Sequence, residues 1–334
     1  MRAFRFAYDG RPFYGFQRQP DVPTVEDAIL DALCELDVAP AGGTPPGYSA
    51  AGRTDRGVSA LAQTVAFECP AWCSPGALNG ALPASVRAWA AADVPADFHA
   101  THDAVRREYT YHLYAPRAGA SADAGRPAAS EWGDDAPRGD DDRDGTTAPG
   151  VEPFGAVRRS VAPVDDDRVR LLLDRLSGEH DFHNLTPDDR GTVRDLTLDA
   201  TRDGDVLVLR VAAGGFARQL VRRLVTLVRA VGTGDRALDF VDRVLAPAPL
   251  DGSDGIGPAA PEPLVLTAVD YPAGRFEVDA DAAAATRAIF AGRAREAAVV
   301  ARVSGAIADG VGAGRDRDGE GSAGGGRDDR GASQ

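Results

Sequence analysis

Alternation of apolar and polar residues predicts strands along much of the chain. Near the N-terminus Phe4, Phe6 and Tyr8 recur at every second position, which places them on one face of a strand. Tyr109 and Tyr111 share a strand face in the same way. Further strands are predicted over residues 61–67, 107–114, 193–201, 206–212 and 264–270. The third and fourth of these flank an Asp-Gly turn signal, which indicates a hairpin.

Other segments repeat with the helical period of three to four residues. Thr24 precedes two acidic residues and an apolar stripe, so we expect a helix with a hydroxyl cap and an acidic first turn. The longest helical pattern covers residues 215–231. Its apolar side chains lie on one side, and Arg218, Arg222 and Arg229 lie on the other. Shorter helices are predicted over residues 74–82 and 165–176.

The mixture of hairpins and helices predicts an α+β fold with a mainly antiparallel sheet, because the chain lacks a regular strand–helix–strand rhythm. We expect an N-terminal α+β half over residues 1–115 and a C-terminal half over residues 151–292. Residues 116–150 carry almost no large apolar side chains, which predicts a flexible acidic insertion. Residues 293–334 are predicted to form a disordered tail, since Gly, Arg and Asp predominate beyond about residue 300.

Composition adds a strong acidic bias to this picture. The chain has 334 residues and a formal net charge of −14, and all 37 of its basic residues are arginine. A surface rich in carboxylates stays soluble in concentrated salt, so we expect a saline cytoplasm. The overall charge argues only weakly against a nucleic-acid partner, because a binding cleft needs only local arginines.

The sequence offers few signs of a membrane, disulfide or metal function. It shows no signal-peptide core and no apolar run near the length of a membrane span, so we expect a cytoplasmic protein. Three cysteines are too few for a disulfide scaffold. Cys69 and Cys73 lack a second pair, and His180 and His183 lack further ligands, so no metal site is expected.

The most informative segment is the glycine-bracketed loop over residues 52–57, which places Asp55 between Arg53 and Arg56. A fixed carboxylate in such a loop can act as a nucleophile or a base. Taken alone, the same segment is more often a solvated polar turn. Its interpretation therefore depends on what the rest of the chain brings to it.

Three other features could join this loop. Tyr109 could stack on an unstacked base, or it could be a core aromatic residue. The arginine strip with Arg218 and Arg222 suits phosphate binding, although it could be a solvated helix face. Gln17 and Arg18 lie in an aromatic, amide-rich opening segment that could contact RNA or be a plain exposed loop.

Several motifs in order resemble the tRNA pseudouridine synthase A (TruA) family. Residues 14–19 resemble its YxGWQRQ opening, and residues 52–60 resemble its GRTDxGVxA signature. Residues 220–222 match its MVR helix. Residues 97–100 and 109–111 match the segment that carries its active-site tyrosine, and residues 263–272 resemble its closing strand.

The resemblance implies a fold of two similar halves, with mainly antiparallel sheets joined around a central RNA-binding cleft. It gives Asp55 the position of the nucleophilic aspartate and Tyr109 that of the tyrosine stacking on the target base. Arg53 and Arg222 take the positions of active-site arginines, with Arg222 able to pair with Asp55. The implied activity is isomerisation of uridine to pseudouridine at positions 38, 39 and 40 of tRNA. It needs no cofactor, and members are often homodimers.

The chain also departs from the commonest family pattern. Bacterial members usually have alanine at the position of Arg56 and histidine at that of Ser59, so this chain is more similar to archaeal and eukaryotic relatives. Thr101 stands where many members have a basic residue. A non-catalytic RNA-binding or chaperone protein is the main alternative. A hydrolytic glycosidase would usually need a second carboxylate paired with Asp55.

Overall fold

The computed structural model describes residues 1–117 and 162–311. These residues fall into two compact units that divide after Thr286. Most of the predicted insertion, from residue 118 to residue 150, lies outside the described residues. Residues 312–334 of the predicted tail lie outside them as well.

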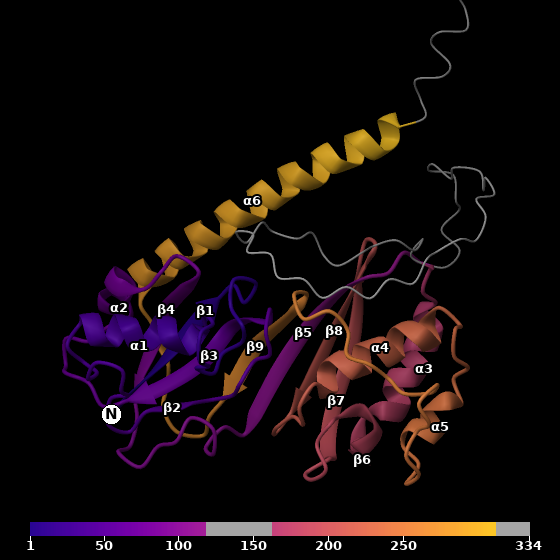
Figure 1. The fold of residues 1–334 in the computed structure, drawn as a ribbon, viewed down its shortest axis with the longest axis horizontal. Helices are drawn as coiled ribbons and strands as arrows, with labels where there is room; N and C mark the ends of the chain where they lie inside the picture. Colours follow the sequence, from indigo (N-terminus) through magenta and orange to yellow (C-terminus); the bar gives the residue numbers. More distant parts are fainter. Residues whose placement is uncertain (118–161, 312–334) are drawn as a thin grey trace, which may run out of the picture. The chain divides into compact units, whose positions relative to one another are not determined.

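The first unit is built on one large, mostly antiparallel sheet (Figure 1). Its strands follow the spatial order β10-β4-β1-β3-β9-β5-β8-β7-β6, with β2 beside β3. Among the described strands only β3 and β9 pair in parallel, through two aligned residue pairs. The strands are β1 Arg2–Tyr8, β2 Ser49–Ala50, β3 Ser59–Phe67, β4 Val86–Asp93, β5 Arg106–Tyr114, β6 Gly178–Asp181, β7 Val193–Asp203, β8 Val206–Ala213, β9 Leu264–Asp270 and β10 Glu277–Val278.

Helices of the first unit pack against the strands near both ends of this sheet. The helices are α1 Val25–Glu35, α2 Pro75–Ala81, α3 Asp166–Leu176, α4 Leu220–Gly232, α5 Phe240–Val244 and α6 Ala280–Gly310, with a short 3-10 helix at His183–Leu185. In Figure 1, α1 and α2 lie beside the strands of the N-terminal part, and α3, α4 and α5 lie beside β6, β7 and β8. The Thr24 hydroxyl accepts a hydrogen bond from the backbone N–H of Asp27 at 3.2 Å, which confirms the predicted cap.

Two large apolar clusters form the core, one under α1 and α2 and the other under α3, α4 and α5. Tyr109 on β5 packs against both clusters. Strand β5 precedes residue 115, yet it pairs with β8 on one side and with β9 on the other. The chain segments predicted as two halves with joined sheets therefore contribute strands to one continuous sheet.

Two predicted elements differ from the structure. Helix α4 begins at Leu220 and not at residue 215, because Gln219 has a left-handed backbone with φ of 60°. Helix α6 continues to Gly310, so it covers residues 293–310 of the predicted disordered tail. This segment is rich in alanine and arginine, two strong helix formers, while its apolar residues were too scattered to show a helical stripe.

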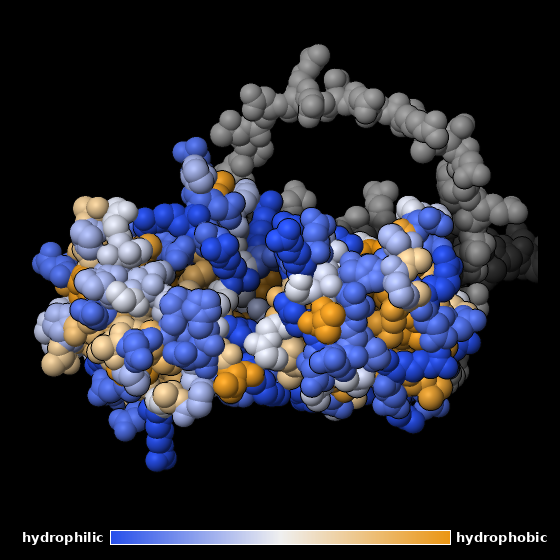
Figure 2. Space-filling model, turned by 90° about the horizontal axis from the view of Figure 1, so that it is seen from below, coloured by the Kyte–Doolittle hydropathy of each residue, from blue (hydrophilic) through white to orange (hydrophobic). Residues whose placement is uncertain are grey.

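Strand β4 was not predicted, because its apolar residues also show no regular period. Six of its eight residues are apolar, and they lie on both faces of the sheet, so the strand shows no alternation. No helix in the described residues is long and apolar enough to cross a membrane. Hydrophilic residues cover most of the face shown in Figure 2.

Candidate active site

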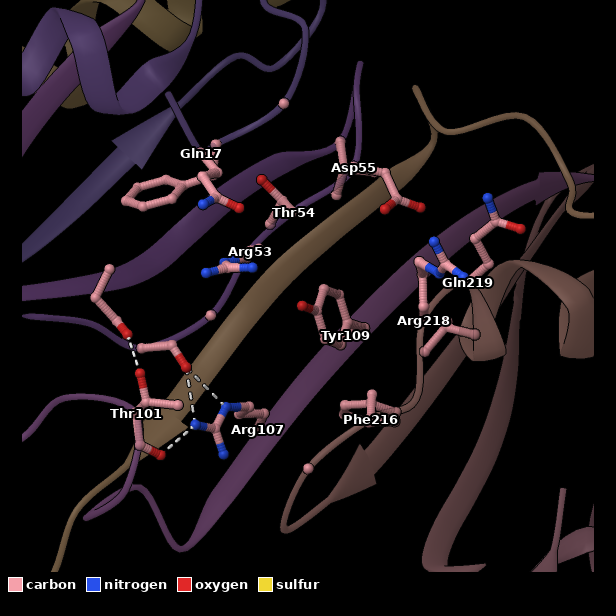
Figure 3. Close-up of a pocket in the computed structure, with 18 of the residues that line it drawn as sticks. Gln17, Arg53, Thr54, Asp55, Thr101, Arg107, Tyr109, Phe216, Arg218 and Gln219 are labelled. Atoms are coloured by element: carbon pink, nitrogen blue, oxygen red, sulfur yellow. Dashed lines mark hydrogen bonds between the residues drawn. The ribbon is translucent and has the colours of Figure 1, made fainter. Parts of the chain in front are cut away.

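A cavity of about 1150 Å³ opens over the middle of the sheet. Figure 3 shows Gln17, Arg53 and Asp55 on one wall, Phe216 and Arg218 on the opposite wall, and Tyr109 between them. Six arginines and three carboxylates line the cavity, so its lining carries a formal charge of +3. The local charge is therefore opposite in sign to that of the whole chain, which is −14.

The loop that carries Asp55 is held from below by the sheet. Thr54 is buried, and its hydroxyl shares a hydrogen bond of 2.8 Å with the hydroxyl of Tyr8 on β1. The buried Gln63 on β3 donates a hydrogen bond of 2.7 Å to the carbonyl of Gly52. Neighbouring side chains of an extended chain point to opposite sides. Because the Thr54 side chain points to the sheet, those of Arg53 and Asp55 point to the cavity.

Residues 13–16 contact the other side of the loop that carries Asp55. The N–H of Phe16 donates to the carbonyl of Thr54 at 3.0 Å, and the N–H of Gly57 donates to that of Phe13 at 3.3 Å. Gly15 has a φ of +107°, and a Cβ atom there would lie 3.0 Å from the carbonyl oxygen of Thr54. Glycine is therefore required at position 15 both by conformation and by space.

Asp55 faces the first turn of α4 across the cavity. The Arg222 guanidinium donates to the Asp55 carboxylate at 2.9 Å, which confirms the expected pairing. The Nε atom of Arg222 also donates to the carbonyl of Ala259 at 2.7 Å. The Arg222 side chain is 13% exposed and that of Asp55 is 34% exposed. A largely covered guanidinium thus orients a carboxylate that remains open to a ligand.

Tyr109 stands on β5 between the two walls. Its ring meets Phe216 edge to face, with the ring centres 5.2 Å apart. Burial raises the pKa of Tyr109 to about 12, with a smaller contribution from the charge of Asp55 and an opposing one from Arg107. The phenol is therefore neutral at physiological pH and offers an aromatic surface close to the carboxylate.

The other predicted site residues differ in whether they line the cavity and in whether their side chains already have partners. Arg53 and Gln17 line it with exposed side chains, and Arg53 makes no hydrogen bond or ion pair within the described residues. Arg218 also lines it, but precedes α4 and pairs with Asp188 at 3.3 Å. The structure does not bring Arg18 to the cavity, because its guanidinium binds Asp27 at 2.7 Å.

Arg107 is a site residue that the sequence reasoning overlooked. Its guanidinium donates to the carbonyls of Ala51, Thr101 and Gly214, at distances of 2.6–3.1 Å, and the bonds to the first two carbonyls are drawn in Figure 3. Arg107 thereby connects the Asp55 loop to the segment that leads from β8 to α4. Its position two residues before Tyr109, on the same strand face, was the signal that could have revealed it.

Among the described residues, no group of His, Cys, Asp and Glu side chains is arranged to hold a metal ion. The three cysteines are free thiols.

Comparison with known proteins gives this geometry a context. The family model described as tRNA pseudouridine synthase matches residues 172–272. The chain is 52% identical to tRNA pseudouridine synthase A of Haloarcula marismortui, over 93% of this chain and 100% of that protein. The namesake from Natronomonas pharaonis is 52% identical, over 92% and 98% of the two chains. The protein of the same name from Methanocella arvoryzae is 33% identical, over 83% and 86%.

Proposed function

The chain belongs to the tRNA pseudouridine synthase A family, and from this premise we propose that it converts uridine to pseudouridine in the anticodon stem and loop of tRNA. The positions we assign are 38, 39 and 40. The reaction breaks the N1–C1′ glycosidic bond, turns the uracil and joins C5 to C1′. It is an isomerisation, so its atoms balance without a co-substrate.

The observation that carries this proposal is the Asp55–Arg222 pair beside Tyr109 in an open cavity. A base must leave its stack to react, which costs a few kcal/mol. The Tyr109 ring can offset part of that cost by stacking on the base, since such contacts contribute about 1–3 kcal/mol. The oriented carboxylate of Asp55 then supplies the group that attacks the sugar or the base, or removes a proton.

The charge of the cavity supports an RNA ligand. A lining of +3 within a chain of −14 attracts a polyanion to this place and not to the remainder of the surface. Within the described residues Arg53 makes no hydrogen bond or ion pair, so its donors are available to the RNA. Gln17 and Arg218 also line the cavity, although Arg218 is paired with Asp188. Arg18 is bound to α1 and has no part in this proposal.

The decisive test replaces Asp55 with asparagine, which keeps the size of the side chain and removes its negative charge. We expect Asp55→Asn to bind tRNA and to form no pseudouridine. Asp174→Asn on the exposed face of α3 is the matched control and should retain wild-type turnover. Retained turnover in Asp55→Asn would rule out the carboxylate as the essential group.

A second experiment separates the enzyme from a non-catalytic RNA-binding protein. Pseudouridine is mapped in tRNA from cells with and without this chain. Loss of the modification at positions 38, 39 and 40 is the expected result. Unchanged tRNA would favour the binding protein, although a carboxylate facing phosphates is unfavourable for binding alone.

We also propose a saline cytoplasm as the setting, supported by the Lys-free acidic composition. Activity should require concentrated KCl, and full activity without added salt would contradict this part. The expected homodimer remains a prediction for light scattering in the same buffer.

A further inference from the structure

We propose that Arg56, seated on the ring of Tyr14, binds a phosphate of the RNA next to the target uridine. This assignment rests on the proposed function and adds to it a contact that selects for the RNA backbone. The guanidinium carbon of Arg56 lies 4.2 Å from the centre of the Tyr14 ring. Both residues line the cavity that contains Asp55.

The donors of Arg56 are available to a ligand. Its side chain is exposed, and within the described residues it forms neither a hydrogen bond nor an ion pair. Other arginines of the cavity are already engaged, as Arg222 pairs with Asp55 and Arg218 pairs with Asp188. The contact with the Tyr14 ring lies at the guanidinium carbon, and within the described residues the N–H groups have no acceptor.

Stacking also limits the movement of this side chain. Arg56 stands at the tip of a turn closed by a hydrogen bond of 3.1 Å from Val58 N–H to the carbonyl of Asp55. Tyr14 is fixed by its own N–H, which donates to the carbonyl of Pro23 at 2.9 Å. A guanidinium restrained in this way loses less conformational entropy on binding a phosphate through two parallel hydrogen bonds.

The position of Arg56 points to a phosphate and not to a base edge. Arg53 and Arg56 flank Asp55 in the loop, and neither has a carboxylate partner within the described residues. A nucleotide whose sugar approaches Asp55 carries a phosphate on each side of that sugar. The excess positive charge of the cavity favours the same ligand.

The test compares tRNA binding by Arg56→Gln and wild-type protein over a series of KCl concentrations. Loss of one phosphate contact should lower the slope of log Kd against log[KCl] by about 0.7–0.9. At the lowest KCl concentration at which the wild-type protein is active, we expect Kd and KM to rise roughly tenfold, as for a lost charge-assisted hydrogen bond. Arg56→Lys should restore the slope, since it restores the charge, but only part of the affinity.

Two further variants test the role of the ring. Tyr14→Leu removes the stacking surface and should lose part of the affinity, whereas Tyr14→Phe keeps that surface and should lose less affinity than Tyr14→Leu. Tyr14→Leu should add little to Arg56→Gln, because the ring acts through the guanidinium. Arg170→Gln on α3, whose side chain pairs with Asp167 outside the cavity, is the control for charge and should keep the wild-type slope.

The outcomes separate this assignment from the proposed function. An unchanged slope in Arg56→Gln, in a protein that forms pseudouridine, would overturn the phosphate contact alone. Absence of pseudouridine formation by the wild-type protein would overturn the proposed function, while the slopes would still decide whether Arg56 binds phosphate.

Discussion

Replacing Arg107 with methionine should weaken both the fold and the reaction. Methionine preserves most of the apolar stem and removes the guanidinium that joins three backbone carbonyls. Two of the four hydrogen bonds reach the carbonyl of Ala51, a residue that is 1% exposed. Without Arg107 that buried oxygen lacks a donor, which costs about 1–3 kcal/mol.

The other contacts of Arg107 contribute less to stability. Its bonds to Thr101 and Gly214 lie at the surface, where water can replace them, so we add about 0.5 kcal/mol for each. The free energy of unfolding should therefore fall by about 2–4 kcal/mol. Because the Asp55 loop is then held less firmly, kcat should fall by about 10- to 100-fold.

Urea unfolding in concentrated KCl measures the first effect, and single-turnover pseudouridine formation by the folded variant measures the second. Arg106→Met is the control, because Arg106 makes exposed ion pairs and its loss should cost at most about 1 kcal/mol. Arg107→Lys should recover part of kcat. We propose that Arg107 connects the Asp55 loop to the opposite wall of the cavity through hydrogen bonds. This role would be refuted if the two methionine variants lost equal stability, or if Arg107→Met kept the wild-type kcat.

Three further predictions test the same framework. Gly15→Ala should cost about 1–3 kcal/mol in the free energy of unfolding, because φ is +107° and the carbonyl of Thr54 lies 3.0 Å from the added atom; an unchanged urea midpoint would contradict this. Tyr109→Phe should keep most of kcat/KM, whereas Tyr109→Leu should lower it by about 10- to 100-fold through lost stacking, and equal values would exclude a stacking role. Arg202 holds the pKa of Asp166 below its usual range. Stability from this pair is therefore present above about pH 4 and lost as pH falls through the lowered pKa. In acid unfolding, Asp166→Asn should lack this part of the pH dependence, and identical profiles would contradict it.

Local patterns in the sequence were sufficient for most individual elements. The cap at Thr24, the alternation in β1 and the hairpin of β7 and β8 each depend on residues close together in the chain. Such features follow from side-chain period and capping chemistry, which do not require knowledge of distant segments. The failures at β4 and α6 arose where alanine-rich segments carry little periodic signal.

The candidate site also combines features that are visible in short segments with features that depend on distant parts of the chain. The glycine-bracketed loop and the tyrosine of β5 were visible as motifs, and the resemblance to one family supplied the pairing of Asp55 with Arg222. Their convergence depends on the tertiary structure, because 167 positions in the chain separate these two residues. Sequence alone could not tell that Arg18 is bound to α1 or that Arg218 precedes α4.

The sequence by itself determined most of the elements and pointed to most of the side chains that we propose for the chemistry, since both follow from the residues of short segments. Only the tertiary structure decided how these segments meet. Strand β9 lies between β3 and β5, so strands from both ends of the chain share one sheet. Arg107 then joins the Asp55 loop to the opposite wall through backbone carbonyls. Every residue has such a carbonyl, so no sequence pattern marks the ones that Arg107 binds.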